Sequence, residues 1–334
     1  MSAALGPSGF IVIDKPSGIT SFDVIRELRR SLKIKKLGHS GVLDKPATGV
    51  LVVGANKATR LFELFAAFEK IYTAEIWLGL STTTDDLTGE LRTAGPGRLP
   101  ERAEVEAVLN EYSGTIDQIP PAFSLTKLGG KELYRYALAG EEVEVKPKRV
   151  TVLGSRMLDY TAGLDLADAL DRDAALHGEL ENVPKLARAL VELRCVGGVY
   201  VRSIARDVGA DLGTEGTLGR LTRNRVGPFS EDDALSLDDV ARHMSDGGTA
   251  AELLHPLASV APEEKSLELD PTQLAMVRNG QSIRRFKHHL PPGAEKRGDI
   301  VFGLDPAHDL AVVLKVAGVN QHSLVELRPH KVIG

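Results

Sequence analysis

Cysteine is almost absent from this sequence, which has a single one, Cys195, in 334 residues. One cysteine excludes a disulfide framework and any zinc site built from several thiolates. Apolar runs long enough to span a bilayer are missing too, and the first residues contain neither a basic segment nor a long apolar one that would direct export. We therefore expect a protein of the reducing cytoplasm that has no membrane span.

The sequence also lacks the usual cofactor motifs. It contains no Walker loop, no Gly-x-Gly-x-x-Gly and no His-Glu-x-x-His. The neighbouring acids Asp85 and Asp86 have no further ligands at the spacing of a metal site. We expect neither an organic cofactor nor a bound metal.

A strong net charge is lacking as well. The formal net charge of −5 and the 43% of hydrophobic residues are those of an ordinary globular chain, long enough for one large domain and a small one. The charge is nevertheless segregated. Residues 1–70 contain 11 Lys and Arg against 6 Asp and Glu, whereas residues 159–181 contain seven acids and only Arg172. Because the acidic stretch would repel phosphates, we place it away from any surface that binds a polyanion.

What the sequence does contain is one carboxylate in a loop rich in glycine. Asp44 lies between Gly41 and Gly49, ahead of an apolar strand at residues 50–53. Glycine permits tight turns and close backbone approaches. An Asp in such a segment is most often a turn former. His39, the only histidine in the first half of the chain, lies just upstream, and the pair favours a functional loop.

Hydrophobic periodicity predicts the elements around this loop. A buried strand at residues 9–14 ends in a Lys-Pro-Ser-Gly turn, and Thr20 begins a helix whose apolar face includes Phe22. Residues 70–80 alternate like a half-buried strand that carries Tyr72. The other expected elements are helices near 57–68, 102–113 and 235–240, paired strands near 150–158 and 190–195 with the acidic stretch inserted between them, a linker at 255–262 and a strand-rich module at 264–334.

Two further segments contain residue types suited to catalysis or to phosphate binding. Alternation places Tyr200 and Arg202 on one face of a strand, where an arginine could bind a carboxylate bidentately and hold it ionised. Taken alone, a capping or surface arginine is the better interpretation. Residues 118–140, which include Lys127, are basic and aromatic and suit either an RNA-gripping element or a surface hairpin.

Taken together, ordered segments over residues 9–230 resemble the motifs of the bacterial TruB family, the tRNA pseudouridine-55 synthases. The central match runs from Gly38-His39 through Leu43-Asp44 to Leu51, although Lys45 separates Asp44 from the proline that usually follows it. The other matching segments are Lys15-Pro16-x-Gly18-x-Thr20-Ser21, Lys70-x-Tyr72, the Thr- and Asp-rich stretch 79–90, the stretch 120–140, Tyr200-Val201-Arg202 with the residues up to Gly213, and Leu221-x-Arg223.

The resemblance implies an α+β chain with the pseudouridine synthase fold, a mixed, mainly antiparallel sheet flanked by helices and loops. It implies a catalytic domain over residues 1–258 with an acidic insertion near 159–182, and a small PUA-like RNA-binding β domain over 264–334. Asp44 would be the catalytic carboxylate, Arg202 its partner, and Tyr72 the residue that stacks on uracil. Tyr72 could relay the proton lost from C5 only if its surroundings lower the pKa of an ordinary phenol. The implied substrate-binding residues are His39, Asp86, Lys127, Tyr200 and Arg223.

The function implied by the resemblance is conversion of uridine to pseudouridine at position 55, in the T loop of tRNA, after the nucleotide has flipped out of the loop. The chain would act as a monomer on the T arm, with no cofactor, metal, membrane or obligate protein partner. Three alternatives stay open. They are a glycoside hydrolase that uses Asp44 and Asp86, a non-catalytic chaperone that binds and refolds tRNA, and a guide-dependent relative that acts on ribosomal RNA.

Overall fold

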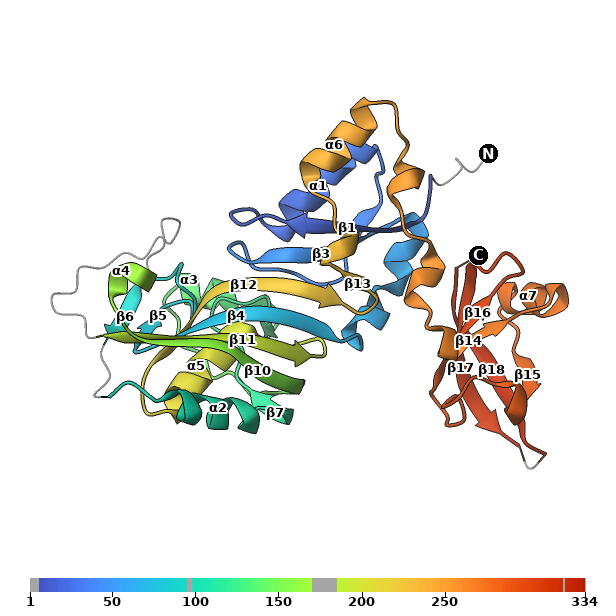
Figure 1. Ribbon diagram of the computed structural model, residues 1–334. Coiled ribbons are helices and arrows are strands. Elements are labelled where there is room, and N and C mark those ends of the chain that lie inside the picture. The colour runs from blue at the N-terminus through green and yellow to red at the C-terminus, as the bar shows by residue number, and fades with distance from the viewer. Residues whose placement is uncertain (1–5, 95–97, 170–184, 321, 334) are drawn as a thin grey trace.

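A computed structural model of the chain describes residues 6–94, 98–169, 185–320 and 322–333. Within them, nine strands form the main sheet, whose neighbours follow the order β1-β3-β12-β4-β11-β10-β7 (Figure 1). Its strands are β1 (Gly9–Lys15), β3 (Thr48–Ala55), β12 (Gly216–Val226), β4 (Lys70–Leu78), β11 (Leu186–Cys195), β10 (Lys148–Leu164), β7 (Gly114–Gln118), β2 (Leu37–His39) beside β3, and β13 (Phe229–Ser230) beside β12. Among the described strands of this main sheet, β3 and β12 are the one pair that is parallel, so the predicted mixed and mainly antiparallel sheet is confirmed.

Helices pack on this sheet at two places. Helices α5 (Val201–Asp211) and α2 (Arg102–Glu111) lie under the β4-β11-β10 half, and α1 (Ser21–Leu32) and α6 (Leu237–Ser245) lie together at the β1 end (Figure 1). Thr20 caps α1 in a capping box with Asp23, as the sequence predicts for the helix start. The predicted apolar face is wrong at one position, because Phe22 is 61% exposed.

Short elements complete the main domain. They are η1 (Asn56–Ala66), the hairpin β5 (Leu80–Thr82) and β6 (Leu91–Ala94), the hairpin β8 (Lys127–Leu128) and β9 (Lys131–Glu132), α3 (Leu133–Leu138), α4 (Leu166–Ala169), η2 (Glu231–Asp233), η3 (Ala250–Leu253) and η4 (Leu257–Val260). The segment predicted as a helix near residues 57–68 is therefore a 3-10 helix. Strand β10 continues to Leu164, beyond the end predicted near residue 158, so the first residues of the stretch predicted as an acidic insertion belong to this strand. Most of the insertion lies outside the described residues.

The C-terminal module is a second sheet, with the order β14-β16-β17-β18-β15. Its elements are η5 (Glu263–Lys265), β14 (Ser266–Glu268), α7 (Pro271–Arg278), β15 (Ile283–Phe286), η6 (Lys287–His289), β16 (Ile300–Leu304), β17 (Leu310–Val319) and β18 (Leu324–Val332). One hydrophobic cluster joins Phe10 and Phe65 of the main domain to Phe302 and Val313 of this module. The small β domain predicted here is confirmed, and it packs on the main domain through this shared core.

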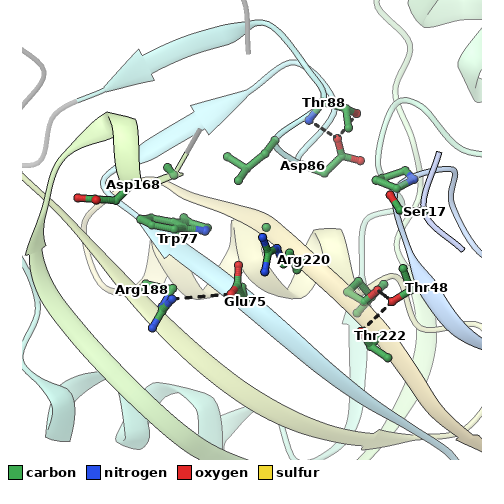
Figure 2. A pocket seen from close by; sticks show the side chains of 15 residues that line it. Ser17, Thr48, Glu75, Trp77, Asp86, Thr88, Asp168, Arg188, Arg220 and Thr222 are labelled. Atoms are coloured by element: carbon green, nitrogen blue, oxygen red, sulfur yellow. Dashed lines mark hydrogen bonds and ion pairs between the residues drawn. The ribbon is translucent and has the colours of Figure 1, made fainter. Parts of the chain in front are cut away.

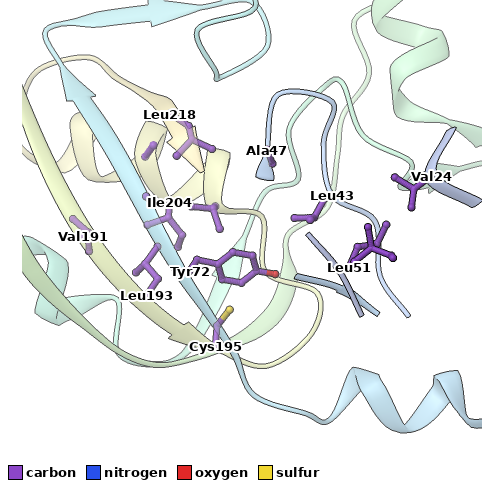
Figure 3. Packing of buried hydrophobic residues seen from close by; sticks show 14 of the residues in the cluster. Val24, Leu43, Ala47, Leu51, Tyr72, Val191, Leu193, Cys195, Ile204 and Leu218 are labelled. Carbon is purple, nitrogen blue, oxygen red and sulfur yellow. The ribbon is translucent and has the colours of Figure 1, made fainter. Parts of the chain in front are cut away.

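The largest hydrophobic cluster lies between the main sheet and its helices, and it includes residues of the Asp44 loop. Leu43 and Ala47 are both nearly inaccessible to solvent, and they share this core with Tyr72 and Ile204 (Figure 3). The apolar side chains on either side of Asp44 therefore anchor the loop, while Asp44 itself points out of the core. Among the described residues, no helix has the length and apolarity needed to cross a membrane.

Candidate active site

Lys15 holds the Asp44 loop from behind. Its ammonium lies at the end of β1, fully buried, and donates to the carbonyls of Ala47 at 2.6 Å and Lys45 at 3.2 Å. It also donates to the carbonyl of Pro16 at 2.9 Å. Desolvation lowers the pKa of Lys15 to about 8, against the opposing effect of the Asp44 charge.

Arg223 holds the same loop from β12. Its side chain is 2% exposed, and it donates to the carbonyls of Val50 at 2.8 Å, Gly41 at 3.2 Å and Val42 at 3.5 Å. At Gly49 the backbone has φ +93°, and a Cβ there would lie 2.4 Å from the Arg223 carbonyl oxygen. Glycine is required at this position because the loop returns to the sheet directly against β12.

Arg202 approaches Asp44 from the first turn of α5. Its Nε lies 2.9 Å from Oδ2 of Asp44, which forms an ion pair. The other two guanidinium nitrogens donate to the carbonyls of Thr84 and Phe123, each at 3.0 Å. The prediction that Tyr200 and Arg202 share a strand is wrong, because Tyr200 is the N-cap residue of α5 and Arg202 is helical. The helix still brings the predicted pair together.

Asp86 provides a second carboxylate behind the arginine. Its Oδ2 lies 3.7 Å from Nη1 of Arg202. Its Oδ1 accepts hydrogen bonds from the hydroxyl of Thr84 at 2.7 Å, the hydroxyl of Thr88 at 2.5 Å and the amide of Thr88 at 3.0 Å. Asp86 is buried and satisfied within its own loop, so it fixes the loop carbonyl that holds Arg202.

The Asp44 carboxylate opens into a cavity of about 670 Å³. The side chain is 41% exposed to this space. Desolvation nevertheless raises the pKa of Asp44 above its ordinary value. The charge of Arg202 opposes the rise, Asp86 adds to it, and Lys15 opposes it. The site therefore combines a carboxylate that is costly to ionise with a fixed cation that favours its ionised form.

Four other predicted residues line the same cavity as Asp44, namely His39, Tyr72, Tyr200 and Arg202. Burial raises the pKa of Tyr72, so its surroundings do not lower it and the phenol stays neutral. Burial also lowers the pKa of His39, with a smaller contribution from the charge of Arg223, which favours a neutral imidazole. The Tyr200 hydroxyl lies 3.0 Å from the hydroxyl of Thr126.

Three predicted substrate-binding residues lie outside the lining of this cavity: Asp86, Lys127 and Arg223. Lys127 is exposed on β8, and the other two are buried in the scaffold described above. Sequence reasoning missed Phe22, Val42, Leu125 and Tyr134, which do line it. The helical period predicts Phe22 in the core. The segments that contain Val42, Leu125 and Tyr134 were predicted to be functional, but their composition did not single out these three residues.

A second cavity, of about 380 Å³, borders the next residues of the same loop. It is lined by Pro46 and Thr48 together with Trp77, Asp86 and Thr88. Figure 2 shows Asp86 and Thr88 close to each other and across the cavity from Trp77. Consecutive residues of the loop that presents Asp44 thus line two cavities, Val42 to Lys45 the first and Pro46 and Thr48 the second. Within the described residues, no group of three or more His, Cys, Asp or Glu side chains is placed to hold a metal ion.

Comparisons with known proteins agree with this fold. Residues 29–169 match the N-terminal domain model of the TruB family pseudouridylate synthases, and residues 202–267 match the C-terminal domain model of tRNA pseudouridylate synthase B. A structure of an H/ACA ribonucleoprotein bound to a substrate RNA containing 2′-deoxyuridine matches with a TM-score of 0.68. At 22% identity it covers 98% of this chain and 85% of that chain, which shows a shared fold.

Curated relatives are closer in sequence. The tRNA pseudouridine synthase B of Thermobifida fusca (strain YX) is 39% identical over 290 residues, which are 85% of this chain and 89% of that protein. The protein of the same name from Geobacillus kaustophilus (strain HTA426) is 36% identical over 289 residues, 86% of this chain and 93% of the relative.

The fold and the matched domains define an enzyme of the pseudouridylate synthase class. Within that class, the chain belongs to the TruB family, since both domain models match and the relatives are similar over most of their length.

Proposed function

We propose that this enzyme converts uridine to pseudouridine at position 55, in the T loop of tRNA. The observation that carries the proposal is the ion pair between Asp44 and Arg202 at 2.9 Å, on the wall of a cavity that opens to solvent. The relatives named tRNA pseudouridine synthase B support tRNA as the substrate.

The reaction needs one carboxylate and no redox step. The bond between N1 of uracil and C1′ of ribose breaks, the base turns, and C5 bonds to the same C1′. C5 then loses its proton and N1 gains one. Asp44 acts either as the nucleophile or as the group that stabilises positive charge in this sequence, and Arg202 keeps it ionised and oriented.

The remaining lining residues shape the pocket for an extruded base. Tyr72 packs against the uracil, and because burial raises its pKa, the phenol is a poor base for the C5 proton. His39, neutral and at the loop, fills the space that the uridine leaves in the RNA. Tyr200 forms part of the cavity wall, and its hydroxyl lies beside that of Thr126.

Asp86 and Arg223 act in this proposal as positioning residues. Asp86 fixes the Thr84 loop that carries Arg202, and Arg223 fixes the carbonyls of the Asp44 loop. Their burial supports these roles better than the substrate contacts implied by the resemblance. Lys127, exposed on β8, is available to an RNA phosphate.

We further propose that residues 1–258 form the catalytic domain and residues 264–334 a domain that binds the same RNA. The C-terminal sheet has a cavity of about 450 Å³ lined by Arg297, Lys315 and Arg328. Lys315 and Arg328 are directly opposite each other on β17 and β18. Arg328 is ion-paired with Glu326 at 3.0 Å, while Arg297 and Lys315 add two more positive charges to the same cavity, which suits an RNA phosphate.

The experiment is primer extension after carbodiimide treatment of an unmodified tRNA transcript incubated with the purified protein alone. A stop at the T-loop uridine is expected with the wild type and absent with Asp44→Asn or Arg202→Ala. A hydrolase would release base or sugar, whereas isomerisation leaves the RNA mass unchanged. If the protein were a chaperone, the Asp44→Asn variant would keep its function. If it were a guide-dependent enzyme, the purified protein alone would leave the tRNA unmodified.

A further inference from the structure

Three large apolar side chains surround the opening of the Asp44 cavity and face solvent. Phe22 of α1 is 61% exposed, Leu125 of the loop before β8 is 60% exposed, and Val42 of the Asp44 loop is 51% exposed. Single exposed apolar side chains are normal on a protein surface. Here three separate elements each place one exposed apolar side chain in the lining of a single cavity, and we call these three residues the apolar rim.

Phe22 belongs to this rim and does not contribute to the folding of helix α1. The buried face of α1 consists of Val24, Ile25, Leu28 and Leu32, with Ser21 at its start. The helix is capped by Thr20 and Asp23, so Phe22 contributes to neither the cap nor the core. A ring this exposed adds little burial to the fold, and a role in binding explains its place at the cavity.

The RNA chain itself places a ligand at this rim. A uridine that enters the cavity remains bonded through its 5′ and 3′ phosphates to two neighbouring nucleotides. Because the RNA chain continues on both sides of the uridine, it must pass through the opening of the cavity, which brings a neighbouring nucleotide to the rim. Lys45 lines the same opening with an exposed side chain, and its ammonium suits a phosphate between the reacting and the adjacent nucleotide.

We propose that the rim of Phe22, Val42 and Leu125 binds an unpaired nucleobase directly adjacent to the reacting uridine, stacked on the Phe22 ring. This inference rests on the proposed function, because it assumes that uridine is the occupant of the cavity. Stacking on an aromatic ring tolerates any base, so the rim selects for an unstacked neighbour rather than for its identity. The enzyme would thereby prefer a uridine within a loop over one within a duplex.

The test is a cycle between protein and RNA changes. Phe22→Ala, Phe22→Tyr and the control Leu138→Ala are compared on a tRNA transcript and on transcripts that lack the base on the 5′ or the 3′ side of the target. Leu138 is the matched control because it is 72% exposed on α3 and does not line the cavity. Both the kcat/KM for pseudouridine formation and the Kd for RNA in an Asp44→Asn background are measured.

We expect Phe22→Ala to lower kcat/KM and weaken binding about 10-fold on the intact transcript. Phe22→Tyr should restore both, and Leu138→Ala should behave as the wild type. On the transcript that lacks the stacked base, Phe22→Ala should cost nothing further. An equal loss on all three transcripts, or no loss on any, would overturn the inference. Failure of the wild type to form pseudouridine would instead overturn the proposed function, and the binding cycle would still decide the role of Phe22.

Discussion

Nε of Arg202 lies 2.9 Å from Oδ2 of Asp44, although one residue belongs to the first turn of α5 and the other to the loop between β2 and β3. The rest of the guanidinium is bound to the carbonyls of Thr84 and Phe123. The direction in which Arg202 presents its charge is therefore set by the protein before any substrate binds, which is the arrangement that electrostatic catalysis needs.

Replacing Arg202 by lysine should remove this arrangement while keeping the positive charge. A lysine ammonium lacks the planar fork of donors, so it cannot keep the Asp44 ion pair together with both carbonyl contacts of Arg202. We expect kcat/KM to fall about 100-fold or more and the free energy of unfolding to fall by about 3 kcal/mol, since the buried partners lose their donor. Arg206→Lys on the same helix is the control, because Arg206 pairs with Asp85 and Asp207 away from Asp44. Equal losses in both variants would contradict this.

Asp44→Asn should abolish activity without lowering stability. The folded state raises the pKa of Asp44, so the ionised carboxylate costs folding free energy at neutral pH. Its contribution to stability is fully present below the ordinary pKa of aspartate and is lost as the pH rises through the raised value. Urea unfolding at pH 7 should therefore give Asp44→Asn a stability equal to or above that of the wild type. A loss of more than about 1 kcal/mol would contradict the account.

Asp86→Asn is the contrasting variant, because Asp86 is satisfied by the Thr84 and Thr88 groups and faces Arg202. We expect it to lower the free energy of unfolding by about 1 to 3 kcal/mol. It should also shift the acid limb of the pH–activity profile. Asp86 helps to raise the pKa of Asp44, so its removal should move the limb of kcat/KM to lower pH. Movement to higher pH would contradict the assignment of Asp44 as the group that must be ionised.

Lys15→Met should make the free energy of unfolding depend less on pH in the alkaline range. The pKa of Lys15 is lowered to about 8, so between pH 8 and the ordinary value of 10.5 the unfolded chain binds more protons than the folded one. Wild-type stability gains from this difference as the pH rises, by no more than about 3 kcal/mol. Denaturant unfolding at pH 8 and pH 10 measures it. The free energy of unfolding of the wild type minus that of the variant should be larger at pH 10 than at pH 8. The same difference at both pH values would contradict a buried Lys15 that is charged at pH 7.

Much of the fold follows from local signals in the sequence, whereas the pairing of Asp44 with Arg202 follows only from the resemblance of their two motifs to those of a family. The Thr20 cap, the apolar strand after Asp44 and the small C-terminal β domain are confirmed. Arg202 was expected on a strand, because a few alternating residues fit the start of a helix equally well. This error did not affect the predicted pairing of Arg202 with Asp44, because that prediction came from the motif and not from the hydrophobic periodicity.

The support of the site could not be predicted, because it consists of long-range contacts to backbone carbonyls. Nothing in the residues near Lys15 or Arg223 indicates that their side chains end on the Asp44 loop. Polar residues within a motif were therefore interpreted as substrate ligands, and the burial of Asp86 and Arg223 points instead to positioning. Phe22 was the opposite case, since an apolar residue at a helical position was expected in the core and lies at the site.

The central claim is that one carboxylate, Asp44, isomerises a uridine in the T loop of tRNA. Its most direct test compares wild type and Asp44→Asn, with the purified protein and unmodified tRNA alone, by carbodiimide primer extension. The account predicts a single modified T-loop uridine with the wild type and none with the variant, although the variant folds as stably. Modification by Asp44→Asn at the wild-type rate would contradict it.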